Sequence, residues 1–149
     1  MTRPAAPPPL GAYPVRTFDT VRYGDTDRQG HVNNAVFATF LESGRVALLY
    51  DAARPLAEPG AAFVIARLTL DFLGEITWPG RIDIGTGVSR IGRSSVVLHQ
   101  GLFQAGACVA TGESVIVQVD QRTRRSTPLS DAAVRHLQGL IGLPAPQGS

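Results

Sequence analysis

Hydrophobic residues between positions 36 and 48 recur at the spacing of one face of a helix. This face contains, in order, Val36, Phe37, Phe40, Leu41, Gly44, Ala47 and Leu48. Steps of three and four residues are typical of an amphipathic helix, and so broad a face predicts that the helix is mostly buried. We expect the helix to run from Asn33, whose side chain is a suitable N-cap, to about Asp51.

The other hydrophobic positions mostly alternate with polar ones, as in strands that bury one face. The expected strands are residues 13–23, 62–72, 82–89, 94–104 and 107–120. In the strand 62–72, the alternation places one set of residues on the apolar face and Arg67, Thr69 and Asp71 on the other. The apolar set is Ala62, Val64, Ala66, Leu68, Leu70 and Phe72. Pro79 and Gly80 separate the second strand from the third, and short turns separate the later ones. The last strands must therefore form antiparallel hairpins. A short final helix is expected from the N-cap Ser130 to Gly139.

One antiparallel sheet is the only large apolar surface available to cover the long helix. We therefore predict an α+β fold, with a five-stranded antiparallel sheet wrapped around a long central helix. One face of the last strand has small residues that suit a close approach by the helix. They are Cys108, Ala110, Gly112 and Ser114. Glu42 and Arg45, three residues apart, are expected on the remaining polar strip of the helix.

Composition is typical of a single soluble globular domain. The chain has 149 residues, of which 44% are hydrophobic and 17% are charged, with a formal net charge of +2. These values suit one domain with a proper core. We assign that domain to residues 13–141, with flexible termini at residues 1–12 and 142–149.

The charged residues and the single cysteine argue against several classes of function. All fourteen basic residues are arginine and most are scattered, so nucleic-acid binding has little support. No segment suits a membrane span, and the N-terminus lacks the apolar core of a signal peptide. Cys108 alone forms neither an internal disulfide nor a cysteine-based metal site. We expect a cytoplasmic protein.

The stretch YGDTDRQGHVNN, residues 23–34, joins the first expected strand to the helix. Its acids resemble the start of a calcium-binding loop, with Asp25 and Asp27 at the first and third positions. The pattern fails at Gln29, where Asp or Asn is required, and at Val36, where a bidentate glutamate is required. Asp, Gly and Asn are also ordinary turn residues, so a purely structural turn remains an alternative.

Two features of this stretch favour a chemical role. From Gly24 to Gly30 it is longer than a simple link needs, and it leads into a helix N-terminus, whose free N–H groups attract negative charge. Asp27 precedes Asn34 by seven residues, so a carboxylate and a backbone donor for an oxyanion can share one site. Asp25 is expected to shape the turn by accepting backbone hydrogen bonds.

The residues from Arg22 to Arg45, RYGDTDRQGHVNNAVFATFLESGR, resemble the signature of hot-dog-fold acyl-CoA thioesterases of the 4-hydroxybenzoyl-CoA thioesterase type. Residues 88–96, VSRIGRSSV, are similar to that family's turn between its third and fourth strands. The resemblance extends over roughly residues 15–128. It implies the hot-dog fold and an acyl-CoA thioesterase that releases a carboxylic acid and free coenzyme A.

The resemblance also implies roles for individual residues. Asp27 matches the catalytic carboxylate, acting as a nucleophile or as a general base, and the backbone N–H of Asn34 matches the donor that polarises the thioester carbonyl. His31 and Asn33 are expected to position the water or the thioester, with a capping or core role for His31 as an equal alternative. Phe37 departs from relatives that carry Tyr, so contacts through a hydroxyl are not expected there.

Coenzyme A carries phosphates, which arginine binds well. In the family its nucleotide end lies near the turn between the third and fourth strands. The residues of this chain at that turn are Arg90, Arg93, Ser94 and Ser95. Arg124 and Arg125 form a second cluster for the same phosphates, or else belong to the solvated surface. We expect no metal and no cofactor, since coenzyme A is part of the substrate.

In this family the site forms between two protomers whose sheets pair, so the resemblance implies a homodimer or a dimer of dimers. Two alternatives to an acyl-CoA thioesterase remain open. A thioesterase acting on acyl carrier protein would dock its substrate as a protein. A non-catalytic acyl-CoA-binding module would be unaffected by the loss of the Asp27 carboxylate.

Overall fold

A computed structural model describes residues 6–142 of the chain. Its elements are η1 (Leu10–Ala12), β1 (Val15–Thr20), η2 (Tyr23–Asp25), α1 (Asn34–Leu49), β2 (Ala61–Phe72), β3 (Arg81–Ile91), β4 (Ser95–Gln104), β5 (Ala107–Asp120) and α2 (Asp131–Gln138). This is the predicted order of one strand, a long helix, four strands and a short helix. The short 3₁₀ helix η1 lies within the N-terminal segment that we expected to be flexible. The rest of that expectation, for residues 1–5 and 143–149, falls outside the described residues.

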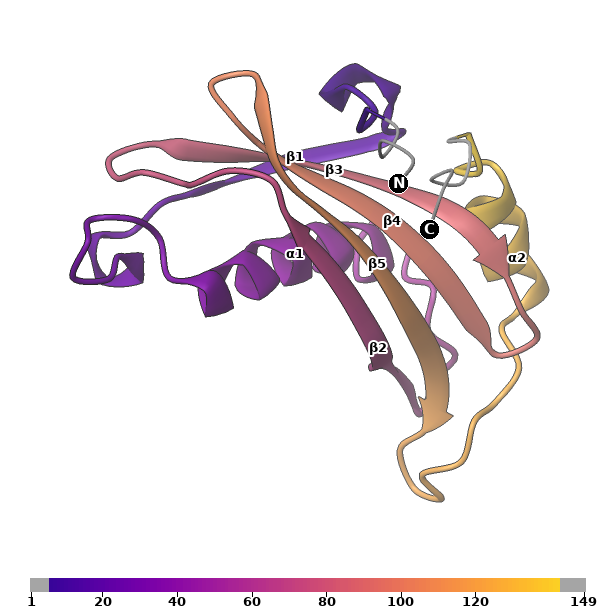
Figure 1. The fold of residues 1–149 in the computed structure, drawn as a ribbon. Helices are drawn as coiled ribbons and strands as arrows, with labels where there is room; N and C mark the ends of the chain where they lie inside the picture. Colours follow the sequence, from indigo (N-terminus) through magenta and orange to yellow (C-terminus); the bar gives the residue numbers. More distant parts are fainter. Residues whose placement is uncertain (1–5, 143–149) are drawn as a thin grey trace, which may run out of the picture.

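All five strands belong to one antiparallel sheet in the order β1-β3-β4-β5-β2. The predicted hairpins are present, since β3, β4 and β5 are neighbours in both sequence and sheet. β1 lies at one edge and β2 at the other, because α1 carries the chain across the sheet between them. The sheet curls over α1 (Figure 1), and this confirms the predicted α+β hot-dog architecture.

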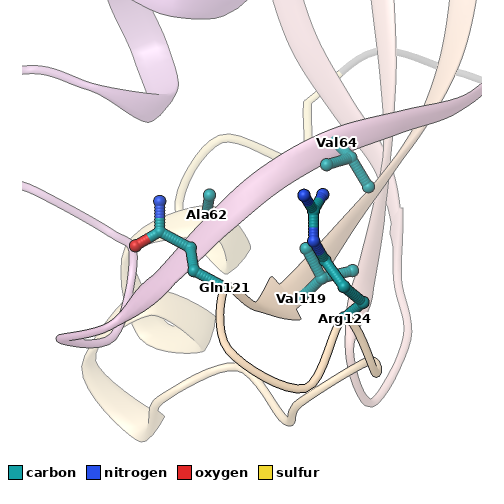
Figure 2. A pocket seen from close by; sticks show the side chains of 5 residues that line it. All are labelled: Ala62, Val64, Val119, Gln121 and Arg124. Carbon is teal, nitrogen blue, oxygen red and sulfur yellow. The ribbon is translucent and has the colours of Figure 1, made fainter.

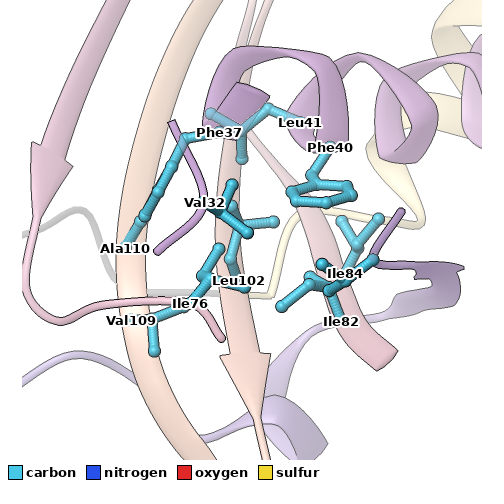
Figure 3. Packing of buried hydrophobic residues seen from close by; sticks show 11 residues of the cluster. Val32, Phe37, Phe40, Leu41, Ile76, Ile82, Ile84, Leu102, Val109 and Ala110 are labelled. Atoms are coloured by element: carbon cyan, nitrogen blue, oxygen red, sulfur yellow. The ribbon is translucent and has the colours of Figure 1, made fainter. Parts of the chain in front are cut away.

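α1 lies close against the sheet at Gly44. A Cβ atom at this position would lie 2.5 Å from Cγ2 of Ile84 and 2.6 Å from Nε2 of Gln100. Gln100 also donates a hydrogen bond from Nε2 to the carbonyl oxygen of Leu41 at 2.8 Å. Figure 3 shows the core at the N-terminal half of the helix, where the buried residues include Phe37, Phe40, Leu41, Ile82, Ile84 and Leu102.

The small residues of β5 follow the prediction only in part. Gly112 faces the helix, since a Cβ atom there would lie 2.8 Å from Cδ1 of Leu41, and Ala110 belongs to the same core. Cys108 does not share their face, because the register between β4 and β5 shifts beside it and it packs with Phe103 instead. A β-bulge therefore places the thiol on the other side of the sheet.

β2 contains a second bulge, and the alternation predicted for the whole strand is wrong. The register between β2 and β5 shifts between Ile65 and Arg67. After the bulge, Leu68 packs against the core beside α1. Before it, Phe63 is the residue that packs inward, and Val64 is 44% exposed.

Arg45 is buried, which corrects its expected place on a polar strip of α1. It is 7% exposed, and its Nη1 has no hydrogen-bond partner among the described residues. Burial lowers the pKa of this guanidinium, and the carboxylate of Glu42 opposes the shift. The curled sheet covers more than one side of α1, so less of the helix is left for polar residues than one-sided packing would leave.

α2 lies at the end of the sheet opposite the start of α1 (Figure 1). Ser130 is its N-cap, as predicted, and accepts a hydrogen bond from the Ala133 N–H at 3.0 Å. Ala133 and Leu137 belong to the same buried cluster as Val88 of β3. Within residues 6–142, no helix has the length and apolar character needed to cross a membrane.

Candidate active site

The turn between β1 and α1 is organised by hydrogen bonds among its own backbone groups. The N–H of Asp27 donates to the carbonyl of His31 at 2.8 Å, and the N–H of Gly30 donates to the carbonyl of Asp27 at 3.1 Å. Gly30 has a φ of 82°, a conformation that glycine adopts without steric cost. Thr26 and Val32 pair across the turn. The turn is therefore compact, and it presents an exposed Asp27.

Asp25 and Asp27 both accept backbone hydrogen bonds. Oδ2 of Asp25 accepts the N–H of Arg22 at 2.8 Å, which confirms its expected part in shaping the turn. Oδ1 of Asp27 accepts the N–H of Gln29 at 2.8 Å and that of His31 at 3.3 Å. One carboxylate oxygen of Asp27 thus helps to hold the turn, and Oδ2 makes no hydrogen bond to a described residue.

α1 begins as predicted, with Asn33 as its N-cap. Oδ1 of Asn33 accepts the N–H of Ala35 at 3.0 Å, and its carbonyl accepts the N–H of Val36 at 2.9 Å. Asn34, the first helical residue, is exposed and has no intrahelical acceptor for its N–H. This donor and the positive end of the helix dipole are available beside the turn, where they can stabilise an oxyanion.

His31 contacts a residue that no sequence pattern indicated. Its Nε2 lies 3.0 Å from Oε2 of Glu75, in the loop after β2. His31 also forms an isolated β-bridge with Thr77, and Gln104 holds Thr77 through hydrogen bonds of 3.0 Å to its N–H and 2.9 Å to its carbonyl. Sequence spacing gives no sign of Glu75 or Gln104, because these contacts join segments far apart in the chain.

Within one chain, the predicted phosphate-binding residues of the β3–β4 turn lie far from Asp27. Thr20 pairs with Arg81, so the Asp27 turn lies beside the start of β3, whereas the β3–β4 turn follows its end. β3 has 11 residues, and a strand of that length spans about 35 Å. The residues at the far end are Arg90, Arg93, Ser94 and Ser95.

Arg124 and Arg125 follow β5 and lie beside the start of β2. Ala61 pairs with Asp120 at this end of the sheet. The N–H of Arg124 donates to the Asp120 carbonyl, and the N–H of Asp120 donates to the Arg125 carbonyl, both at 2.8 Å. A shallow hollow of about 250 Å³ at this end (Figure 2) is lined by Ala62, Val64, Val119, Gln121 and Arg124.

Aromatic rings border the Asp27 turn. The ring of Phe37 packs edge-on against Phe72, with centroids 5.0 Å apart. Tyr23 and Trp78, which are 74% and 46% exposed, lie with centroids 5.1 Å apart. Nowhere in residues 6–142 do three side chains of His, Cys, Asp or Glu gather as metal ligands would.

Comparisons with known proteins bear on this geometry. A 31% identical thioesterase from Thermus thermophilus, crystallised with coenzyme A and Zn, has a TM-score of 0.75 over 89% of this chain and 98% of that one. A predicted thioesterase from Bacillus stearothermophilus is 26% identical, with a TM-score of 0.77 over 88% of this chain and 98% of that one.

Sequence comparisons agree with the structural ones. The protein YsmA of Bacillus subtilis strain 168, itself uncharacterized, is 26% identical over 113 residues, which cover 75% of this chain and 77% of YsmA. Residues 21–137 match the thioesterase-like superfamily. That match includes the Asp27 turn, α1 and strands β2 to β5. The chain therefore belongs to the thioesterase-like superfamily.

Proposed function

We propose that the protein is an acyl-CoA thioesterase that hydrolyses a thioester to a carboxylic acid and free coenzyme A. The observation that carries the proposal is an exposed Asp27 in the turn that leads into Asn34, the free N–H donor at the start of α1. Family membership supports a thioester hydrolase. The coenzyme A bound by the Thermus thermophilus relative supports a coenzyme A thioester as substrate. The narrower resemblance to 4-hydroxybenzoyl-CoA thioesterases stays a prediction.

In the proposed reaction, Oδ2 of Asp27 is the reactive oxygen, because Oδ1 accepts two backbone N–H groups. As a general base, Oδ2 removes a proton from a water molecule whose oxygen attacks the thioester carbon. As a nucleophile, it attacks that carbon itself, and water then hydrolyses the resulting anhydride. In both routes Asn34 N–H stabilises the negative carbonyl oxygen. The carbon–sulfur bond breaks, and the departing thiolate of coenzyme A takes up a proton.

The proposed site needs residues from two chains. Phe72, at the end of β2, packs on Phe37 in the first turn of α1, whereas Ala61, at its start, lies beside the Arg124 loop. If the β2 strands of two copies pair antiparallel, the start of each lies beside the end of the other. Arg124 of one chain then approaches the Asp27 turn of its partner. We propose a homodimer, or a dimer of dimers, on this basis.

The two arginine clusters lie at the same end of one chain. Antiparallel pairing of two β2 strands therefore places both clusters near the Asp27 turn of the partner chain. The N–H of Gln118 in β5 donates to the carbonyl of Ser94 at 2.8 Å, and the N–H of Leu129 donates to that of Arg93 at 2.9 Å. We assign both clusters to the phosphates of coenzyme A. His31 and Asn33 are assigned to the water or the thioester, and the reaction uses no further cofactor. We place it in the cytoplasm.

Thioester hydrolysis with and without the Asp27 carboxylate tests the proposal. Free thiol is followed with acetyl-, octanoyl- and benzoyl-coenzyme A, using wild type and Asp27→Asn. The amide oxygen still accepts the Gln29 N–H, so the turn is retained while kcat/KM falls at least about 100-fold. Asp51→Asn is the matched control, because Oδ1 of Asp51 accepts the N–H of Ala53 in a similar turn outside the site.

Each alternative gives a different result in this assay. Full hydrolysis by Asp27→Asn contradicts the proposed mechanism. Turnover of acyl carrier protein thioesters alone identifies a carrier-protein thioesterase. Binding of acyl-coenzyme A without any turnover identifies a binding module.

A further inference from the structure

The loop after β2 is held on both sides, and this fixes where Glu75 lies. On one side the N–H of Val32 donates to the carbonyl of Ile76 at 2.9 Å, next to the bridge between His31 and Thr77. On the other side Gln104 of β4 binds Thr77. Glu75 is therefore placed against His31 by backbone pairing and not by side-chain flexibility alone.

The contact between Glu75 and His31 determines which ring nitrogen carries a hydrogen. Oε2 of Glu75 lies 3.0 Å from Nε2, and the two side chains are 68% and 35% exposed. An exposed pair adds little to folding stability, so its main consequence is orientation. Because an ionised carboxylate only accepts hydrogen bonds, Nε2 must donate, and the neutral ring keeps its lone pair on Nδ1.

We propose that Glu75 is a positioning residue for thioester hydrolysis, acting through His31. The inference rests on the proposed function. His31 is joined to Asp27 twice, through its N–H to Oδ1 at 3.3 Å and through its carbonyl, which accepts the Asp27 N–H at 2.8 Å. The ring that Glu75 orients thus belongs to the same turn as the reactive carboxylate. With its hydrogen held on Nε2, the ring offers Nδ1 as an acceptor that aligns the attacking water. Other catalytic sites use the same principle, in which a third residue orients the base by a hydrogen bond.

The position of the ring hydrogen is the direct test, and it needs no substrate. Nitrogen chemical shifts of isotope-labelled histidine are recorded at mildly alkaline pH, and the His31 signals are assigned with His31→Gln. In wild type and Glu75→Gln, whose amide oxygen still accepts, the Nε2–H tautomer is expected. In Glu75→Ala the shifts move toward a mixture of tautomers. An Nδ1–H tautomer in wild type, or identical shifts in wild type and Glu75→Ala, overturns the proposal.

Kinetics with the same coenzyme A thioesters show whether orientation matters for the reaction. Glu75→Ala is expected to lower kcat about tenfold with little change in KM, and Glu75→Gln to restore most of the loss. Glu58→Ala, which removes an acid outside the site, should leave both constants unchanged. A raised KM with an unchanged kcat would assign Glu75 to substrate binding and overturn positioning. If wild type hydrolyses none of these thioesters, the proposed function fails, while the histidine shifts still decide whether Glu75 sets the tautomer of His31.

Discussion

His99 is a buried histidine outside the proposed site, and it predicts a loss of stability in mild acid. It lies between Gly87 of β3 and Glu113 of β5, with its side chain 8% exposed. Burial lowers the pKa of His99 below its ordinary value of 6.5, and the Glu113 carboxylate opposes the shift. The unfolded chain therefore binds this proton more readily, so the free energy of unfolding decreases as the pH falls below about 6.5.

Thermal unfolding between about pH 7.5 and pH 5 checks this prediction. The midpoint should fall in wild type and fall less in His99→Gln, with His136→Gln behaving as wild type. Asp120 affects the free energy of unfolding only in stronger acid. Backbone N–H groups of Thr123 and Arg122 lower its pKa below the ordinary value of 3.8, so the stability that it contributes is lost only as the pH falls below 3.8. An equal fall in wild type and His99→Gln would show that another group is responsible.

Roles that depend on neighbours in the chain could be predicted residue by residue from the sequence. Asn33 and Ser130 cap their helices and Asp25 caps its turn, because these hydrogen bonds join residues no more than three apart. Arg45 and Glu75 depend on contacts across the fold. Spacing along the chain carries no information on such contacts, so the burial of Arg45 and the partner of His31 were missed.

At the scale of elements, the distance between α1 and the sheet depends on the absence of a side chain at Gly44. We expect Gly44→Ala to destabilise the protein by about 1–3 kcal/mol through overpacking. The new methyl group would press on Ile84 and on Gln100, whose hydrogen bond to the Leu41 carbonyl would be strained. This cost exceeds the gain in helix propensity, which is at most about 1 kcal/mol.

Urea unfolding of wild type and Gly44→Ala measures the difference. Gly24→Ala is the matched control, because a Cβ atom at Gly24 would have no atom within 4 Å. Its stability should lie within about 0.5 kcal/mol of wild type. Equal stability of Gly44→Ala and wild type would contradict the prediction, because it would mean that the sheet shifts to accommodate the added methyl group without a cost in stability.

The order and type of the elements could be predicted because helical and alternating patterns differ over ten or more residues. The facing of individual strand residues could not be predicted to the same extent. Period-two alternation holds on either side of a bulge but changes face across it. That is why Cys108 and the first part of β2 were placed on the wrong face, while Leu68 and Gly112 were placed correctly.

At the scale of the whole molecule, β2 is a long strand with one edge unpaired in the described chain. It has 12 residues and lies at the edge of the sheet. Val64, Ile65 and Phe72 are 44%, 47% and 50% exposed. Proteins usually pair or cover so apolar an edge. Antiparallel pairing with a second β2 would give this edge hydrogen-bond partners. It would also bring the Arg124 loop of one chain close to the Asp27 turn of the other.

A mixed dimer tests this arrangement. One subunit carries Asp27→Asn and the other carries Arg124→Gln with Arg125→Gln, each with a different affinity tag so that the mixed species can be isolated. If each site takes Asp27 from one chain and the arginines from its partner, one of the two sites contains both sets intact. The mixed dimer should then regain about half of the wild-type kcat/KM, as expected for one of two symmetry-related sites.

The two parent homodimers are the controls for the mixed dimer. Asp27→Asn should be nearly inactive through kcat, and the double arginine variant should be weakened mainly through KM, because it lacks phosphate contacts that act equally in ground and transition states. If instead each chain served its own site, every site in the mixed dimer would lack one set. The kcat/KM of the mixed dimer would then equal the mean of the two parents, well below half of the wild-type value. That result would contradict the two-chain site. It would do so even if the protein is a dimer, because a dimer can form without sharing residues between its two sites.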